Sequence, residues 1–396
     1  PNEKHRFNVF ASAQHINRDS YYGGGQDPNA YGNTTDLNRM AGSQYVYSFG
    51  KCIFMPADLT AGIEFNQDKL EDNMWGYHRT VDQKVNIGSA FFQNEWKNEH
   101  WGFLIGGRLD KHNLIDHVIF SPRANLRYNP TENINLRFSY SSGFRAPQAF
   151  DEDLYVENVG GNVEMVELAD NLKEERSQSL SASADIYHRF GAFQVNFLVE
   201  GFYTKLSDVF ALTDGEVVDG ILTRTRYNAP GARVMGLTLE GKMAYLTKFQ
   251  VQAGVTLQQS HYSEPHVWNK EAPAVKKMMR TPNTYGYFTA TYTPIKPLSI
   301  ALSGTYTGSM LVPHEPVPGF LEKPITVNTK DFFDIGLKAA YDFKLYKSMN
   351  LQVNAGVQNI FNAYQNDFDK GADRDSGYIY GPSLPRSFFA GVKISY

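Results

Sequence analysis

The stretch Phe249-Gln-Val-Gln-Ala-Gly-Val-Thr-Leu-Gln258 alternates strictly between apolar and polar residues. Successive side chains of a β-strand point to opposite faces, so one face of this segment is apolar and the other is polar. The same alternation recurs at 133–141, 298–306, 332–344 and 349–361. The sequence therefore predicts an all-β protein. Alternation alone does not distinguish a membrane barrel from a soluble sandwich, because both place one strand face in an apolar environment.

The lengths of the connections make that distinction. Short turns are expected near 55–58, 97–99, 129–132, 189–192, 246–248, 294–297 and 345–348. Long polar loops are expected near 15–42, 70–80, 111–117, 144–174, 208–224, 260–281, 308–331 and 362–384. Short turns at one end and long loops at the other are typical of a transmembrane antiparallel β-barrel, here of about 16 strands. Both termini are then expected at the short-turn end.

The last eight residues, Phe389-Ala-Gly-Val-Lys-Ile-Ser-Tyr396, also favour a barrel. Ala390, Val392, Ile394 and Tyr396 would share one apolar face, and an unpaired strand of this kind invites association with other chains. A barrel that closes on itself has no such edge. Trp96 and Trp101, beside a short turn, are expected in the aromatic girdle at the membrane surface.

Composition excludes several other classes of protein. No apolar run approaches the roughly 20 residues of a transmembrane helix, and the net charge of -4 argues against a nucleic-acid partner. Cys52 is the single cysteine of the sequence, which rules out an intramolecular disulfide. We expect no enzyme activity and no required cofactor, because no catalytic triad or metal motif stands out.

Five motifs occur in order along the chain. They are Gly107-Arg-Leu-Asp110 with Ser121-Pro-Arg-Ala-Asn-Leu-Arg-Tyr128, Ser142-Gly-Phe-Arg-Ala-Pro147, Asn171-Leu-Lys173 with Glu175, Ala229-Pro-Gly-Ala-Arg-Val-Met-Gly236 within 228–240, and Asn359-Ile-Phe-Asn362 before the aromatic last strand. Together they resemble the barrel motifs of TonB-dependent outer-membrane receptors, over most of residues 100–396. We interpret Arg145, Pro147, Gly143 and Gly236 as structural residues, and we expect Asn359 and Asn362 to end a strand and begin the last long loop.

The resemblance implies a receptor in the bacterial outer membrane, energised by TonB, for a large and scarce nutrient complex. Members of the family carry an N-terminal plug inside a 22-stranded barrel. Residues 1–396 are expected to be the C-terminal portion of such a barrel, without the plug and the first strands, because Phe7, Val9 and Ala11 already alternate as in a strand. The partners implied are outer-membrane lipid, TonB through the missing N-terminal region, the nutrient ligand and a surface lipoprotein.

Two sets of loop residues are candidates for the site. Aromatic side chains that could stack on a large organic ligand or metal chelate are Tyr21, Tyr22, Tyr31, Trp75, Tyr77, Trp268, Tyr378 and Tyr380. The alternative for about half of them is the membrane girdle. Asp19, Asp27 and Asp36 could gather around calcium, which prefers oxygen ligands. A second acidic group, Asp367, Asp369, Asp373 and Asp375, lies in the last loop. For both acidic groups the alternative is a solvated loop.

The ligand is left open between cobalamin or a related corrinoid and a ferric siderophore. Cobalamin is slightly favoured, because cobalamin receptors of this family have calcium-ordered acidic loops. Haem is disfavoured, because 148–170 contains no histidine; His78, His261, His266 and His314 are expected to be exposed loop residues. The alternative functions are a passive 16-stranded porin, with 144–174 as its constriction loop, and a soluble β-rich adhesin.

Overall fold

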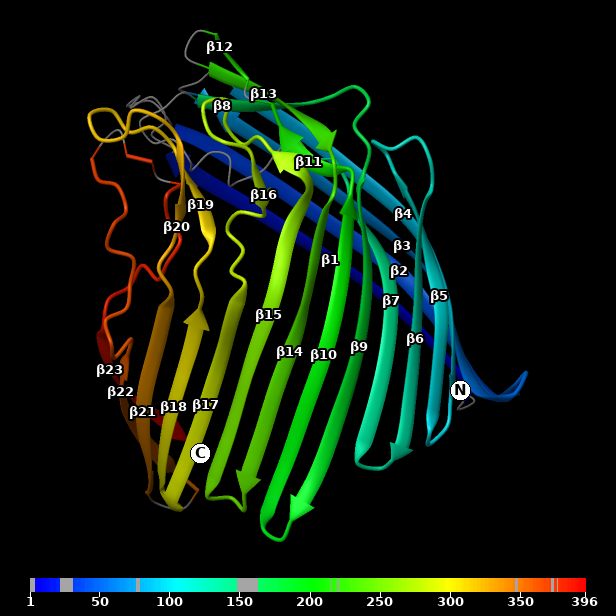
Figure 1. Cartoon of the computed structure of the whole chain (residues 1–396). Helices are drawn as coiled ribbons and strands as arrows, with labels where there is room; N and C mark the ends of the chain where they lie inside the picture. The colour runs from blue at the N-terminus through cyan, green and yellow to red at the C-terminus, as the bar shows by residue number, and fades with distance from the viewer. Residues whose placement is uncertain are drawn as a thin grey trace.

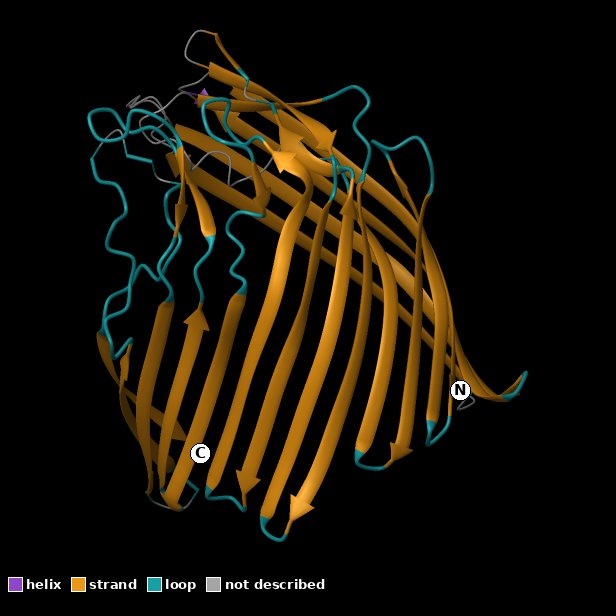
Figure 2. Cartoon of the chain, viewed as in Figure 1, coloured by secondary structure: helices purple, strands orange, loops and turns teal. Residues whose placement is uncertain are grey.

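The computed structural model describes residues 4–21, 31–75, 79–147, 163–213, 215–218, 221–345, 348–371, 374–375 and 377–396. The strands are β1 (His5–Tyr21), β2 (Tyr31–Cys52), β3 (Met55–Met74), β4 (Arg79–Lys97), β5 (Trp101–His112), β6 (Ile119–Thr131), β7 (Ile134–Arg145), β8 (Val163–Leu168), β9 (Glu175–Phe190), β10 (Phe193–Ser207), β11 (Val209–Leu212), β12 (Glu216–Val218), β13 (Ile221–Ala229), β14 (Ala232–Tyr245), β15 (Phe249–His266), β16 (Val275–Lys277), β17 (Thr284–Ile295), β18 (Leu298–Thr307), β19 (Leu311–His314), β20 (Ile325–Asn328), β21 (Phe332–Lys344), β22 (Asn350–Gln358) and β23 (Ser387–Ser395). Figure 2 shows how strands dominate the molecule. Within these ranges no helix has the length and apolar character needed to cross a membrane.

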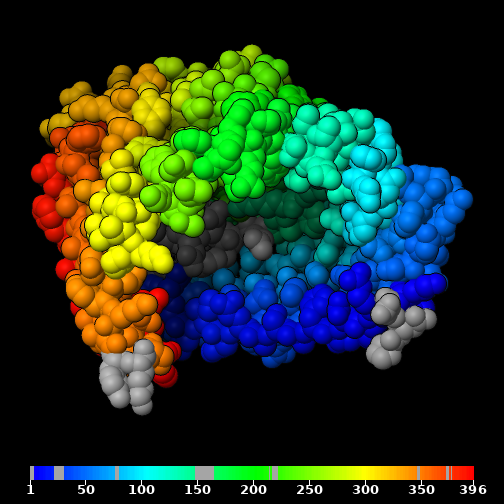
Figure 3. Space-filling model, turned by 90° about the horizontal axis from the view of Figure 1, so that it is seen from below, coloured from blue at the N-terminus to red at the C-terminus, as the bar shows by residue number. Residues whose placement is uncertain are grey.

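The strands form one antiparallel wall. Its order is β1-β2-β3-β4-β5-β6-β7-β9-β10-β14-β15-β17-β18-β21-β22-β23. Of the 17 strands in the main sheet, the three-residue β16 is an addition to β15, which leaves 16 in the wall. Viewed from below, the wall surrounds a hollow (Figure 3). The prediction of an all-β barrel with about 16 strands in this chain is confirmed.

The connections divide between the two ends of the wall. The short turns lie together at one end, and both termini are near it, whereas the long connections lie at the other end (Figure 1). The first long loop is shorter than expected, because β1 continues to Tyr21 and β2 begins at Tyr31, where a loop over 15–42 was predicted. The polar ends of these strands pair with each other beyond the apolar band, so their composition resembles that of a loop.

The two faces of the wall differ as the alternation predicts. On β23 the outer face carries Phe388, Val392 and Ile394, which are 75%, 68% and 60% exposed. On β7 the inner face carries Asn135, Arg137 and Ser139, each paired with a polar residue of β9. Because apolar side chains cover the outside and polar ones line the hollow, this wall is inside out relative to a soluble protein.

Aromatic rings gather on the outer face at the short-turn end. Trp101 stacks on Tyr128 with ring centroids 4.2 Å apart, and Trp96 stacks on Phe54 at 5.6 Å. The indole N–H of Trp96 also donates to the carbonyl oxygen of Cys52 at 3.0 Å. These rings lie where a membrane surface would meet the wall, which fits the predicted girdle.

Candidate functional site

Residues from two of the sequence motifs come together at the long-loop end of β7 and β9. Arg145, the last residue of β7, lies directly opposite Glu175, the first residue of β9. A carboxylate oxygen of Glu175 accepts a hydrogen bond from the backbone N–H of Phe210 at 3.0 Å. The guanidinium carbon of Arg145 lies 5.6 Å from the centre of the Phe210 ring. Residues far apart in sequence thus form one contact.

A small sheet sits above this contact. It consists of β11, β12 and β13, with β8 parallel to β13 (Figure 1). The Thr-Arg-Thr-Arg alternation of β13 brings Arg226 under the sheet, where it is 4% exposed and lies 6.0 Å from the Phe210 ring centre. Phe210 therefore has two guanidinium groups within cation–π distance of its ring.

Asn228 fastens the small sheet to the start of β9. Its side-chain oxygen accepts from the backbone N–H of Lys173 at 2.8 Å, and its amide group donates to the carbonyl oxygens of Lys173 at 3.1 Å and Asp208 at 2.8 Å. We call β8, β11, β12 and β13 together with Arg145, Lys173 and Glu175 the rim assembly. Asn228 and Glu175 thus join the loop segments to the wall, which supports a structural role for these two residues, whereas the Arg145 side chain is exposed.

Glu174 adds a buried ionic contact next to the rim assembly. Its carboxylate is 3% exposed and accepts from Arg176 at 2.6 Å and from His117 at 3.1 Å. Burial opposes ionisation of this carboxyl group, but its hydrogen bonds with the backbone, Arg176 and His117 outweigh burial and lower its pKa. The group therefore holds the 113–118 connection against the beginning of β9.

The last long loop folds onto the β19–β20 hairpin. Asn359 and Asn362 begin it with positive φ values of 50° and 56°, a conformation that asparagine tolerates better than most residues. The Asn359 side chain accepts from the Ala363 N–H at 2.8 Å and donates to the carbonyl oxygens of Ala363 and Leu384, both at 3.1 Å. The prediction that these asparagines end a strand and begin the loop is confirmed.

A small apolar core joins the hairpin to the loop. Met310, Val312 and Tyr378 are its buried members. His314 stacks on Tyr378 with ring centroids 3.8 Å apart and 6° between the planes, and its Nε2 lies 2.9 Å from an Asp369 carboxylate oxygen. We call β19, β20 and the described residues of 359–386 the last-loop assembly.

Tyr380 lies at the edge of that core. Its hydroxyl donates to the Asp367 carboxylate at 2.7 Å. Burial, followed by this hydrogen bond and the negative charge of Asp367, raises the pKa of the Tyr380 hydroxyl. Tyr380 is half-buried and so retains a partly accessible ring.

The predicted aromatic site residues divide into separate groups. Tyr21 and Tyr31 face each other across the ends of β1 and β2, with ring centroids 5.0 Å apart, and both are more than half exposed, as is Trp75 at the end of β3. Tyr378 and Tyr380 belong to the last-loop assembly, and Trp268 is half-buried after β15. Tyr22 and Tyr77 lie outside the described residues.

Two residues expected to be accessible, Tyr378 and His314, are buried. Tyr378 is 4% exposed, so its ring packs against Val312 and His314 and offers no free face to a ligand. His314 was expected on an exposed loop, yet it is 5% exposed. This burial could not be predicted from the local sequence, because the packing partners come from segments more than 50 residues apart.

Asp19 and Asp36, proposed for calcium, do not converge. Ile16 lies opposite Asp36 and Asp19 opposite Asn33, so Asp19 and Asp36 are three positions apart along the hairpin and point to opposite faces. Asp19 instead accepts a hydrogen bond from Asn33 at 2.9 Å. Asp27 lies outside the described residues, so the calcium site stays a prediction. Among the described residues no group of three or more His, Cys, Asp or Glu side chains could hold a metal ion.

Sequence reasoning did not find Phe210 and Arg226 as candidate site residues. A usable signal was present in Arg224-Thr-Arg226, because alternate residues of a strand share a face and two guanidinium groups there make a charged patch. Phe210 gave no signal, since its role depends on the fold of the loop.

The sequence matches the model of the family described as TonB dependent receptor-like, beta-barrel, over residues 2–360. A search of curated proteins found no match. Solved structures that share the fold include the siderophore receptor PirA of Acinetobacter baumannii (TM-score 0.68, 15% identity, 98% of this chain and 59% of that chain). A mutant of the ferric enterobactin receptor PfeA of Pseudomonas aeruginosa is also similar (0.69, 18%, 99% and 59%).

The ferric-catecholate import receptor Fiu of E. coli K12 is a third (0.69, 14%, 99% and 62%). The chain thus spans about three fifths of the length of these structures. Proteins of this family are receptors and transporters of the outer membrane, and the long-loop end of such barrels is extracellular. The chain belongs to the TonB-dependent receptor β-barrel family and is an outer-membrane protein.

Proposed function

We propose that the protein takes up a ferric siderophore across the outer membrane in a TonB-coupled reaction, and that the rim assembly contacts the ligand. The observation that carries this proposal is the position of Arg145. It is exposed at the extracellular end of β7, on the strand face that lines the hollow, and stands beside Phe210 and Arg226. Guanidinium and aromatic groups together suit a negatively charged aromatic iron chelate.

Cobalamin has less support than the sequence suggested. It was favoured because acidic loop residues could bind calcium, and Asp19 and Asp36 lie on opposite faces of their hairpin. The similar structures are siderophore receptors by their own descriptions, although an identity of 14–18% supports the fold alone. A passive porin is disfavoured by the family to which the chain belongs.

Binding to the purified natural protein tests the proposal. Quenching of tryptophan fluorescence would be titrated with a ferric tricatecholate siderophore, with a neutral ferric hydroxamate and with cobalamin. We expect the anionic catecholate to bind most tightly and Arg145→Gln to weaken it by roughly 10- to 150-fold, because a charge-assisted contact contributes about 1.5–3 kcal/mol and each 1.4 kcal/mol is about a factor of ten.

Lys69→Gln is the matched control, because Lys69 lies on the outer face of β3 and is paired with Glu71. It should leave the affinity unchanged. Tight cobalamin binding without siderophore binding would overturn the proposal. A large steady ionic current that no ligand blocks, with no saturable binding, would favour the porin.

A further inference from the structure

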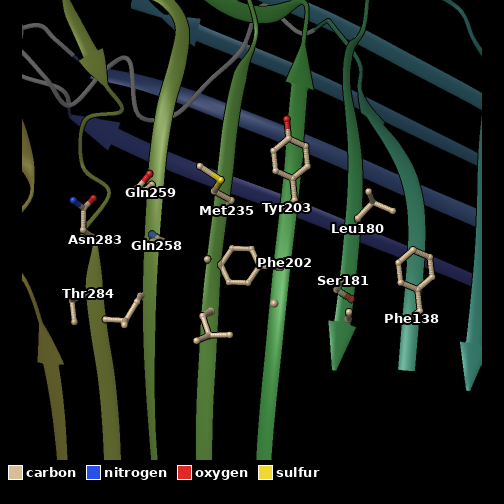
Figure 4. A pocket seen from close by; sticks show the side chains of 15 residues that line it. Phe138, Leu180, Ser181, Phe202, Tyr203, Met235, Gln258, Gln259, Asn283 and Thr284 are labelled. Atoms are coloured by element: carbon tan, nitrogen blue, oxygen red, sulfur yellow. The ribbon is translucent and has the colours of Figure 1, made fainter. Parts of the chain in front are cut away.

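A groove crosses the outer face of the wall between β7 and β15. Its volume is about 890 Å³, and its lining includes Leu180, Tyr203, Met235 and Leu237 (Figure 4). The strand register places these four side chains on the face that points away from the hollow. Gly201 forms part of the floor, and the space over it is open, because a Cβ atom there would meet nothing within 4 Å. The groove therefore opens towards the hydrocarbon of the membrane.

A row of basic side chains lies on the same face, one step nearer the extracellular end. Lys205 is directly opposite Arg233, Arg233 is opposite His261, and His261 is opposite Lys277. Paired residues of neighbouring strands point to the same face, so the four side chains form a line across β10, β14, β15 and β16. We call these four residues the basic row.

Electrostatic repulsion within the basic row destabilises the sheet when no partner is bound. Like charges placed directly opposite each other destabilise a sheet. Within the described ranges, no ion pair joins Lys205, Arg233 or Lys277 to an acidic side chain. On β3, by contrast, the outer-face side chain of Lys69 lies 2.5 Å from the carboxylate of Glu71. An anionic partner from outside the chain would relieve the repulsion in the row.

We propose that the groove and the basic row together bind one lipid of the outer leaflet, with its phosphate groups on the row and an acyl chain in the groove. Lys205 follows Tyr203 by two residues, so the basic row and the upper end of the groove are about 7 Å apart along the strand. That separation matches a phosphate just above the beginning of its hydrocarbon chain. Both halves of the lipid then meet a complementary surface, since lysine and arginine bind phosphate and the groove is largely apolar.

Lipid binding at this surface does not depend on the nutrient ligand. It needs only the outer-membrane location of the wall and the register of four strands. A membrane lipid is favoured over a protein partner because the groove lies at the depth of the hydrocarbon, where a lipid chain is always available.

Native mass spectrometry of the natural protein in mild detergent tests the proposal. The probe is lipid A, a glycolipid with two phosphates, and the comparison is the same lipid after removal of its phosphates. The phosphorylated form should bind at one saturable site, and Lys205→Gln with Arg233→Gln should weaken it at least tenfold. Gly201→Leu, which fills the groove without a backbone clash, should weaken it as well.

Lys69→Gln again serves as the control and should bind as the unaltered protein does. Three outcomes would overturn the proposal: equal binding of both lipid forms, unchanged binding in either test variant, or displacement of the lipid by millimolar inorganic phosphate. The last would identify the row as a site for free anions. Barrel migration on a gel, with and without heating, shows that each variant is folded.

Discussion

The two loop assemblies at the extracellular end are fixed to the same wall by different interactions. The rim assembly is held by polar contacts, with Asn228 bonded to backbone groups and Glu175 to the Phe210 N–H. The last-loop assembly has a small apolar core of Met310, Val312 and Tyr378. The comparison indicates where a ligand can act: polar contacts leave Arg145 accessible, whereas the packed core encloses its aromatic ring.

Removal of the Tyr378 ring should have the largest effect. Tyr378→Ala would leave a cavity beside Val312 and His314, and the local free energy of unfolding of the last-loop assembly should fall by about 3–5 kcal/mol. Hydrogen exchange at the Tyr380 N–H, which donates to Gln365, measures this. Tyr21→Ala is the control and should change stability by less than about 0.5 kcal/mol. Unchanged protection at Tyr380 would mean that the core does not hold the loop.

Asn359→Ala should be next in size. The variant loses three side-chain hydrogen bonds at a residue that is 3% exposed, and it places alanine at a positive φ. We expect a local loss of about 2–4 kcal/mol, confined to the last-loop assembly. Asn359→Gly keeps the backbone conformation and should recover about 1 kcal/mol of this. An equal loss in both variants would contradict the role of the positive φ.

Asn228→Ala is the matching change in the rim assembly. It also removes three hydrogen bonds, but from a more accessible position and without a positive φ. The expected loss is about 1–3 kcal/mol. Exchange should accelerate at the Lys173 N–H and remain unchanged at Tyr380, since effects at distant sites are independent. Acceleration at both would show that the two assemblies are coupled.

The smallest expected effect is the pH dependence of local stability at the beginning of β9. The pKa of Glu174 is lowered in the folded protein from its ordinary value of 4.5, so the folded state favours the carboxylate. The stabilisation is complete above pH 4.5 and is lost as the pH falls through the lower folded value. Protection of the first amides of β9 should therefore decrease on acidification. Glu174→Gln should remove this pH dependence, and its persistence would assign the effect to another group.

The wall was predictable because its pattern is local. Alternation in 133–141 and 249–258 assigns each side chain to a face, and a membrane barrel requires one apolar and one polar face along every strand. The motif residues Asn359 and Asn362 were placed correctly for the same reason, since asparagine ends a strand through its own backbone conformation. The ends of β1 and β2 were missed because beyond the apolar band both faces are polar, and a paired strand then resembles a loop.

The sequence by itself determined the barrel, its family, the two faces of its wall and the end at which the loops gather. Only the tertiary structure decided which residues meet. Arg145, Glu175, Phe210 and Arg226 come from four segments, Tyr378 is buried by a hairpin more than 50 residues away, and the basic row exists only through the register of four strands. Alternation fixes the direction of a side chain within its own strand, whereas its neighbours depend on pairing and loop packing, which no single segment encodes.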